Sequence, residues 1–247
     1  IDWQEFSINA DELTRFVQPG PASAALNRVI GGNPSAIHGT LRANGQVYLI
    51  NSNGIAVGPD GVVNTQSFVA STLDVGTEEF LRGGELTLEG DSDASVKNAG
   101  NIQAVGGDVV LVGRKVENTG SVKAPGGTAS LTAAGKVLLR EKDGQFFVET
   151  RPASHGNPGG TGVLNEGTIE AARAELQAAD GNLYALAINN EGIVRATHAV
   201  EENGRVLLRA DGGRVHQSGI TEARGGSIDI VADEIVLEEA EINVSGL

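Results

Sequence analysis

The side chains that usually carry catalysis or metal binding are few and scattered in this chain of 247 residues. The sequence has no cysteine, and its four histidines are His38, His155, His198 and His216. Their spacing does not match the His-x-x-x-His pattern that places two imidazoles on one helix face for zinc. The Gly-x-Ser-x-Gly elbow, the phosphate-binding P-loop and the Gly-Gly-x-Gly-x-Asp calcium repeat are also absent. We therefore expect no catalytic residues, no metal site and no cofactor.

Carboxylates acting in pairs are the remaining route to enzyme chemistry, since β-solenoids also include lyases and hydrolases. Asp229 and Asp233 are four residues apart, so strand alternation predicts that they point the same way, but no catalytic partner can be identified. The acidic clusters at Glu201–Glu202 and Glu238–Glu241 are typical of solvated turns or edges. The sequence therefore argues against an enzyme.

An internal repeat of short apolar strands and glycine corners is the strongest pattern in the chain. Asn98 and Asn118 occupy equivalent positions 20 residues apart, and each is followed by an apolar strand and a Gly-Gly pair. Looser copies surround Asn165, Asn190 and Gln217. A unit of this length is typical of one turn of a β-solenoid, whose stacked turns bury each other's inward faces. We expect the corners to need the positive φ angles that glycine allows.

Composition agrees with this architecture. Hydrophobic residues make up 40% of the chain but aromatic residues only 4%, and 35 residues are glycine. A core built from Val, Ile, Leu and Ala suits thin stacked β-layers. The formal net charge of −14 argues against nucleic acid as a partner. No apolar run approaches the length of a membrane helix, and the lack of methionine predicts a processed or excised fragment whose signal sequence lay upstream of Ile1.

Two segments depart from the repeat. Residues 140–162 contain the apolar run Gln145–Thr150 and then a stretch rich in Pro and Gly, which predicts a projecting hairpin or loop. Such a projection is either a binding element or a tolerated insertion. The first segment, Ile1–Val75, holds five of the nine aromatic residues. An aromatic cap there would cover the end of the solenoid, where open strand edges favour aggregation.

Several ordered motifs in the first 75 residues resemble those of a known family. The motifs are Trp3–Ile8, Ala25–Val29, Gly31–Gly39, Ala43–Ile55 and Phe68–Asp74. This series resembles the two-partner secretion (TPS) domain of filamentous haemagglutinin-type exoproteins and high-molecular-weight adhesins. One departure is Asn51-Ser52-Asn53-Gly54-Ile55, where the family has Pro between the two asparagines, and a second motif, Asn-Pro-Asn-Leu, is not visible.

The resemblance implies an all-β fold, a right-handed parallel β-helix in a single domain over 1–247. Residues 1–75 would form the N-terminal β cap and first coils, 76–247 the remaining coils, and 140–162 the projection. The expected function is to direct a large adhesin-type exoprotein to an outer-membrane TpsB transporter, through its periplasmic POTRA domains, and to seed β-helix folding outside the cell. The expected location is therefore outside a Gram-negative bacterium, either secreted or on the cell surface, after passage through the periplasm.

The resemblance also points to candidate site residues, which would contact the transporter or stabilise the cap. These residues are Asn27, Arg28, Asn33, Asn51, Asn53, Gly54 and Ile55. Both interpretations remain open, because asparagine side chains also satisfy backbone groups at β-turns.

A binding module is the alternative function. In that hypothesis, a face of the β-helix or the projection around Phe146 and Phe147 would bind a host glycan or protein directly.

Overall fold

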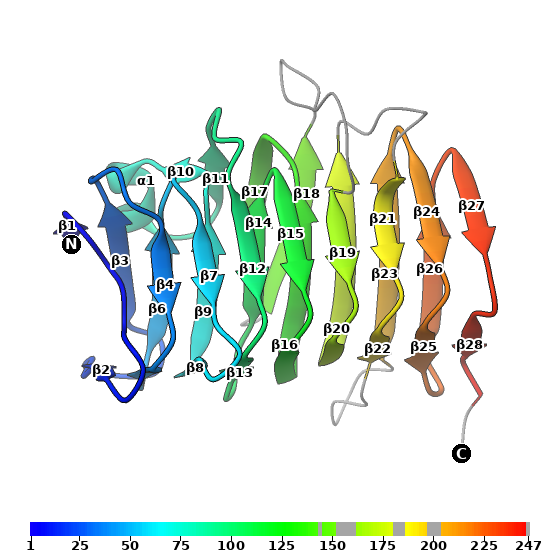
Figure 1. The fold of residues 1–247 in the computed structure, drawn as a ribbon, viewed down its shortest axis with the longest axis horizontal. Coiled ribbons are helices and arrows are strands. Elements are labelled where there is room, and N and C mark those ends of the chain that lie inside the picture. The colour runs from blue at the N-terminus through cyan, green and yellow to red at the C-terminus, as the bar shows by residue number, and fades with distance from the viewer. Residues whose placement is uncertain (143–144, 152–161, 180–185, 197–203, 246–247) are drawn as a thin grey trace.

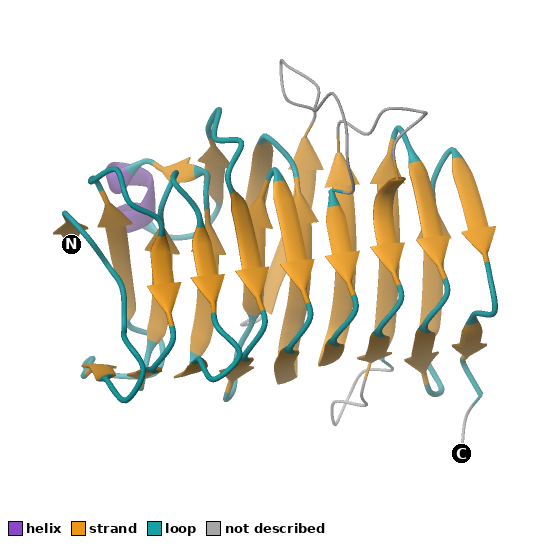
Figure 2. Ribbon diagram, viewed as in Figure 1, coloured by secondary structure: helices purple, strands orange, loops and turns teal. Residues whose placement is uncertain are grey.

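The computed structural model describes residues 1–142, 145–151, 162–179, 186–196 and 204–245. The chain winds into stacked coils along one axis, with the N-terminus at one end and the C-terminus at the other (Figure 1). Strands run along the whole length, and α1 (Thr77–Arg82), near the N-terminal end, is the helix of the described part (Figure 2). The expected right-handed parallel β-helix is confirmed. No described helix combines the length and apolar character needed to cross a membrane.

Three parallel ladders form the faces of the β-helix. The first ladder contains β4 (Ser35–Ile37), β7 (Ile55–Val57), β12 (Ser95–Asn98), β15 (Lys115–Asn118), β19 (Val163–Asn165), β21 (Leu186–Asn190), β24 (Arg214–Gln217) and β27 (Glu234–Leu237). The second contains β2 (Leu13–Phe16), β5 (Thr40–Ala43), β8 (Val62–Thr65), β13 (Asn101–Ala104), β22 (Ile193–Ala196), β25 (Ile220–Ala223) and β28 (Glu241–Asn243). The third contains β1 (Asp2–Trp3), β3 (Ala24–Val29), β6 (Gln46–Ile50), β9 (Ser67–Ser71), β14 (Val109–Gly113), β23 (Arg205–Asp211) and β26 (Ser227–Val231).

Two long strands, β16 (Ser121–Ala133) and β20 (Thr168–Ala179), bend from the second ladder into the third. Their pairing shifts register between Ala124 and Thr128, which is where the bend falls. Because both strands belong to two ladders, the second and third ladders form one continuous sheet.

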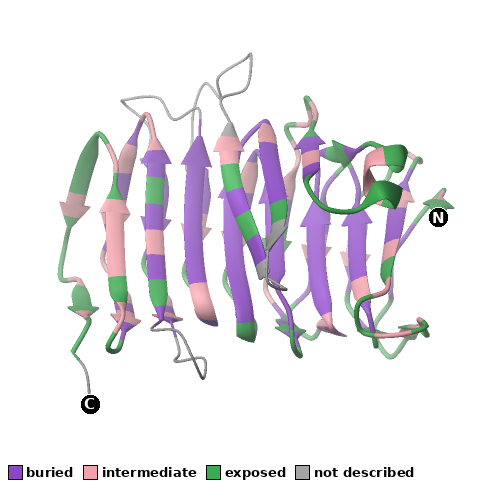
Figure 3. Ribbon diagram, turned by 180° about the vertical axis from the view of Figure 1, so that it is seen from behind, coloured by how far each residue is buried: buried purple, intermediate pink, exposed green. Residues whose placement is uncertain are grey.

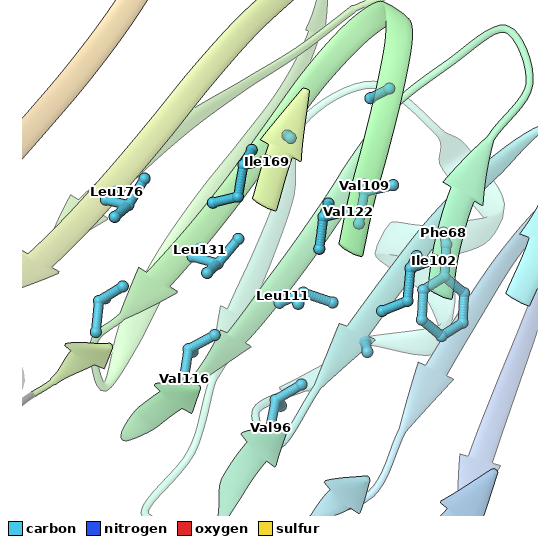
Figure 4. Packing of buried hydrophobic residues seen from close by; sticks show 14 of the residues in the cluster. Phe68, Val96, Ile102, Val109, Leu111, Val116, Val122, Leu131, Ile169 and Leu176 are labelled. Carbon is cyan, nitrogen blue, oxygen red and sulfur yellow. The ribbon is translucent and has the colours of Figure 1, made fainter. Parts of the chain in front are cut away.

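The main core is a set of rows of aliphatic side chains, one residue from each coil. In the third ladder, Leu111 pairs in register with Leu131, which pairs with Leu176, and all three are fully buried. Figure 4 shows these leucines following one another along the axis, beside the row that contains Val122 and Ile169. Each fully buried Val, Leu or Ile contributes roughly 1.5–3 kcal/mol. Because its neighbours come from adjacent coils, a single coil would gain little of this energy alone.

A second apolar core lies on the outer face of the third ladder. There an antiparallel sheet of β10 (Asp74–Val75), β11 (Leu86–Glu89), β17 (Lys136–Lys142) and β18 (Gln145–Arg151) covers the solenoid. The strands underneath are therefore buried on both faces, as the middle of Figure 3 shows. A strand buried on both faces needs no polar alternation, which explains the unbroken apolar run Val109–Val112.

The hairpin predicted within 140–162 differs from expectation in its placement. β17 and β18 do form an antiparallel pair, but Phe146 is only 2% exposed and its ring lies 6.4 Å from that of Tyr48. The described part of this segment therefore packs onto the β-helix. Residues 143–144 and 152–161 lie outside the described part of the chain.

An aromatic cluster closes the N-terminal end of the main core. The rings of Trp3 and Phe6 meet edge to face at 5.5 Å, and Phe16 stacks on Phe6 at 6.5 Å. Phe6 belongs to the buried core, and Trp3 and Phe16 pack against it. Large rings cover the first coil in place of a preceding one, as the aromatic content of this segment predicted.

The corners after the first ladder hold a buried ladder of side-chain amides. Asn98 donates to Asn118 (2.8 Å), Asn118 to Asn165 (2.7 Å), Asn165 to Asn190 (2.7 Å) and Asn190 to Gln217 (2.7 Å). Each buried side-chain amide thus forms a hydrogen bond with the equivalent amide of the next coil, so these polar groups are satisfied without water. This explains why the repeat keeps an amide at this one position.

The prediction that the repeat corners need positive φ angles was wrong for the Asn-x-Gly glycines. Gly100, Gly120, Gly167, Gly192 and Gly219 all have ordinary φ angles. Glycine is required at these corners because the coils stack closely. A Cβ on Gly120, for example, would collide with the carbonyl oxygen of Gly100 in the coil before it. Among the Gly-Gly pairs of the repeat, only Gly225 has a positive φ, of 66°. Close approach of neighbouring coils, and not turn geometry, excludes a side chain at most of these corners.

Candidate functional site

Asn51 forms the centre of the turn between β6 and β7 and is fully buried. Its Nδ2 donates to the carbonyl oxygen of Asn33 (3.0 Å) and to Oγ of Ser35 (2.9 Å). Its Oδ1 accepts from the backbone nitrogen of Asn53 (2.9 Å) and from Nδ2 of the same residue (3.2 Å). The amide therefore has no donor or acceptor left for a partner molecule. These hydrogen bonds join the turn to the segment of Asn33 and Ser35.

Gly54 and Ile55 complete the turn and lead into β7. Gly54 has a φ of 112°, which side-chain-bearing residues rarely adopt, and its nitrogen donates to the carbonyl oxygen of Asn51 (3.0 Å). Ile55 is 2% exposed and belongs to the main core. Gly54 therefore offers a partner no side chain, and the side chain of Ile55 is buried.

Asn53, in this turn, and Asn33, in the loop before β4, both have exposed side chains. Nδ2 of Asn53 donates to the carbonyl oxygen of Gly31 (2.8 Å), while Nδ2 of Asn33 makes a long contact with Glu5 (3.5 Å). Ser52, at the position of the family's proline, is also exposed, and its carbonyl oxygen accepts from Oγ of Ser92 (2.6 Å). Hydrogen bonds to two other segments thus restrain the turn in place of a proline ring.

Asn27 lies in β3 and points inward, beneath the aromatic cap. It is fully buried, its Oδ1 accepts from Nε1 of Trp3 (3.1 Å), and its Nδ2 donates to the carbonyl oxygens of Ala25 (3.2 Å) and Tyr48 (3.3 Å). Trp3 is half-buried, and an indole N–H that packs against a core usually finds an acceptor. Asn27 supplies one, so it positions the cap.

Arg28 points outward from the same strand and joins the β-helix to the covering sheet. Its Nε donates to both carboxylate oxygens of Asp74 (2.9 and 3.0 Å), and one of its terminal nitrogens donates to the carbonyl oxygen of Val75 (2.7 Å). Arg28 pairs with Ile50, the residue before the turn, yet its side chain contacts β10. The seven predicted residues thus divide into a turn cluster and a β3 cluster with separate contacts.

A groove beside the turn was not anticipated from the sequence. It has a volume of about 440 Å³, is open to solvent, and includes Asn53, Gly54, Ala56, Ser95 and Lys115 among its lining residues. The signal in the sequence is a change in side-chain size at outward positions, from Ala36 and Ala56 to Lys97. The groove becomes visible only when the register of the ladder is known, because Ala36 and Ala56 are 20 positions apart and Ala56 and Lys97 are 41 apart.

Two carboxyl groups have shifted pKa values. Burial raises the pKa of Glu175, on β20, to about 7, although Arg173 and a hydrogen bond from Gln177 act in the opposite direction. A hydrogen bond from Arg195, at 2.6 Å, lowers the pKa of Glu222, despite an opposing effect of burial. Glu222 belongs to a charged row on the second ladder, where Arg195 also lies 3.8 Å from Glu170.

The residues considered for catalysis or metal binding do not converge. Asp229 lies in β26 and pairs with Arg205 (3.1 Å), whereas Asp233 lies beyond the end of that strand. His216 contacts Asn189 and Glu238, while His155, His198, Glu201 and Glu202 lie outside the described residues. In the described ranges, no three His, Asp or Glu side chains are grouped as a metal site would need.

A parallel β-helix with an aromatic cap and a fixed asparagine turn beside it places the chain among the β-helical secretion domains of bacterial exoproteins. The family model of the TPS secretion domain matches residues 1–229, and the chain belongs to this family. Such domains pair with TpsB transporters, and the exoproteins are secreted by Gram-negative bacteria. The family is one of secretion domains and not of enzymes.

Two curated relatives from Haemophilus influenzae are described as "Heme/hemopexin-binding protein". One is 35% identical over 230 residues, covering 85% of this chain and 24% of the relative. The other is 32% identical over 270 residues, covering 99% of this chain and 28% of the relative. The chain thus spans about a quarter of the length of these relatives.

Solved structures agree on the fold. The HMW1 secretion domain from Haemophilus influenzae has a TM-score of 0.68 at 26% identity, covering 99% of this chain and 76% of that one. The filamentous hemagglutinin secretion domain has a TM-score of 0.66 at 17% identity, covering 99% and 89% of the respective chains.

Proposed function

We propose that this domain directs a longer exoprotein to an outer-membrane TpsB transporter, is recognised by the transporter's periplasmic POTRA domains, and seeds β-helix folding outside the cell. Membership of the TPS family supports the first part. We also propose that 1–247 is a single domain, with the cap and first coils in 1–75. Passage through the periplasm belongs to the same proposal.

The difference between the two ends of the β-helix is the observation that carries the seeding proposal. The N-terminal end is closed by the aromatic cap, whereas the coil formed by β26, β27 and β28 leaves inward positions uncovered. Ile235 is 44% exposed, although its in-register neighbour Val215 is fully buried. Ile242 is 41% exposed, next to the buried Thr221. A further coil stacked on this end would cover these residues and pair with the free strand edges.

The alternative, direct binding to a host glycan or protein, finds little support in the described part of the proposed projection. Phe146 is buried, and Phe147, at 38% exposed, faces the guanidinium of Arg173 at 4.4 Å. Host contacts therefore remain a proposal for the full-length exoprotein.

Export is the direct test. The chain is fused to a signal sequence, expressed with its cognate transporter, and measured in the medium. We expect export that depends on the transporter. Retention of the parent chain, beside a transporter that exports a known client, would contradict the proposal.

Separate alanine variants at the turn distinguish support of the fold from contact with the transporter. Asn51→Ala removes the amide that bonds Asn33, Ser35 and Asn53, and the hydroxyl of Ser35 is then left buried without this partner, at a cost of roughly 1–3 kcal/mol. We therefore expect this variant to lose stability and export together. Asn53→Ala, at an exposed position, should keep its melting temperature. Reduced export of the folded Asn53→Ala variant would indicate direct contact, and unfolding of this variant would contradict the division of roles.

A further inference from the structure

The groove beside the turn arises from a step in side-chain size on the outer face of the first ladder. In one outward row, Ala56 is followed in register by Lys97 and then Glu117. In the neighbouring row, the small Ser95 is followed by Lys115. Long side chains of two coils thus stand beside small residues of the preceding coils. The resulting groove has a volume of about 440 Å³ and is open to solvent along the surface of the β-helix.

Hydrogen bonds hold both walls of the groove before any partner arrives. On one side, Asn53 is fixed to Gly31 (2.8 Å). On the other side, Oγ of Ser92 donates to the carbonyl oxygen of Ser52 (2.6 Å) and accepts from the nitrogen of Ala94 (3.1 Å). A preformed site avoids the cost of ordering loops on binding, which is often a large part of the free energy of association.

The polar groups on the rim favour a particular kind of occupant. Lys97 is paired with Glu117 at 2.8 Å, whereas Lys115 has no ion pair with any described residue. Across the groove, Oδ1 of Asn53 accepts no hydrogen bond from the described residues, because that side chain uses only its Nδ2 group. The other carboxylate of the lining, Asp93, lies 4.0 Å from the guanidinium of Arg114, so Lys115 is the cation of the lining that suits a carboxylate from a partner. Oδ1 of Asn53 suits a backbone N–H group.

We propose that this groove is the docking site for an extended peptide segment of the transporter's periplasmic region. An acidic side chain of that segment pairs with Lys115, a backbone N–H donates to Asn53, and a small apolar side chain covers Ala56 and Ala94. This inference rests on the proposed function, but it assigns the contacts with the transporter to a partly different set of residues. The buried Asn51 holds Asn53 in place, while the contacts are made by Asn53, Ala56 and Lys115.

Two substitutions with different chemistry test the groove. Ala56→Gln fills its floor and Lys115→Glu reverses the charge on its rim, and both positions point outward from their strands. The matched controls are Val236→Gln, in the same outward row at the far end of the ladder, and Arg82→Glu, on α1. Binding of each purified variant to the purified POTRA region of the cognate transporter is measured by calorimetry, and thermal melting checks each fold.

We expect each groove variant to bind at least about tenfold more weakly than the parent, and each control to bind like the parent. If the parent binds and both folded groove variants bind equally well, the groove is not the docking site, although the proposed function stands. If the parent fails to bind while the POTRA region binds a known client, both the proposed function and the proposed docking site are contradicted. Self-association of the parent that both groove variants abolish, without any change in binding to the POTRA region, would identify a second copy of the chain as the occupant and overturn the inference.

Discussion

Glu175 is a residue whose protonation depends strongly on the fold. It lies on the outer side of β20, is 7% exposed, and accepts a hydrogen bond from Gln177 (2.8 Å), which also donates to Val148 in the covering hairpin (3.0 Å). Burial disfavours the charged carboxylate and raises its pKa from 4.5 to about 7. The folded protein therefore holds this proton more tightly than the unfolded chain does.

The sign of the pH effect follows from this shift. The stabilising contribution is complete below about pH 4.5 and is lost as the pH rises through about 7. A shift of this size corresponds to at most on the order of 3 kcal/mol. In Glu175→Gln, the free energy of unfolding should fall less between pH 5 and 8, as measured by denaturant titration. Glu78→Gln, on the exposed side of α1, is the control. Equal pH dependence in the parent and Glu175→Gln would contradict the assignment.

The hairpin of β17 and β18 is the element that most changes the character of the β-helix. It extends the sheet of β10 and β11, and side chains of the β-helix satisfy its backbone. Asp108 accepts from the nitrogen of Phe146 (3.1 Å), and Thr128 donates to the carbonyl oxygen of the same residue (3.2 Å). The third ladder is therefore the middle layer of a three-layer arrangement over this part of its length.

Phe146 and Phe147 offer a matched pair for testing this layer. Phe146→Ala removes a ring that is 2% exposed, and such truncations cost roughly 3–5 kcal/mol. Phe147→Ala removes a ring that is 38% exposed, and should cost roughly 1 kcal/mol through its contact with Arg173. Denaturant titration measures the loss in the free energy of unfolding for both variants. In Phe146→Ala, hydrogen exchange should show faster exchange of the amides of β17 and β18. Equal losses would show that burial of Phe146 does not hold the hairpin.

At the scale of the whole molecule, the two ends of the β-helix differ in how well their apolar residues are covered. Rings close its N-terminal end, while three inward-facing residues of the last coil, Ile235, Leu237 and Ile242, are 41–55% exposed. Figure 3 shows the contrast between the buried middle strands and the exposed last ones. Exposed apolar residues beside free strand edges favour association.

We therefore expect the isolated domain to self-associate through this end. The triple variant Ile235→Thr, Leu237→Thr, Ile242→Thr should lower the association seen by light scattering, with little change in melting temperature, because these side chains are already half exposed. Val215→Thr, at a fully buried position of the preceding coil, is the control and should lose roughly 1–3 kcal/mol. Unchanged association in the folded triple variant would place the contact elsewhere.

The amino-acid sequence by itself determined the β-helix, because each coil needs apolar residues at inward positions and an amide at one corner, and these requirements recur along the chain. The series of motifs near the N-terminus likewise indicated the TPS family. It also predicted an aromatic cap, since the end of a stack has no neighbouring coil to cover it.

Only the tertiary structure decided which predicted residues are accessible. Asn51 and Asn53 look equivalent in sequence, yet one is buried with all its hydrogen-bonding groups used and the other lies on the rim of a groove. The groove depends on the register between coils, and the buried state of Phe146 depends on a sheet that joins segments about 50 residues apart. Residues from different coils meet through stacking, and spacing along one coil does not encode those contacts.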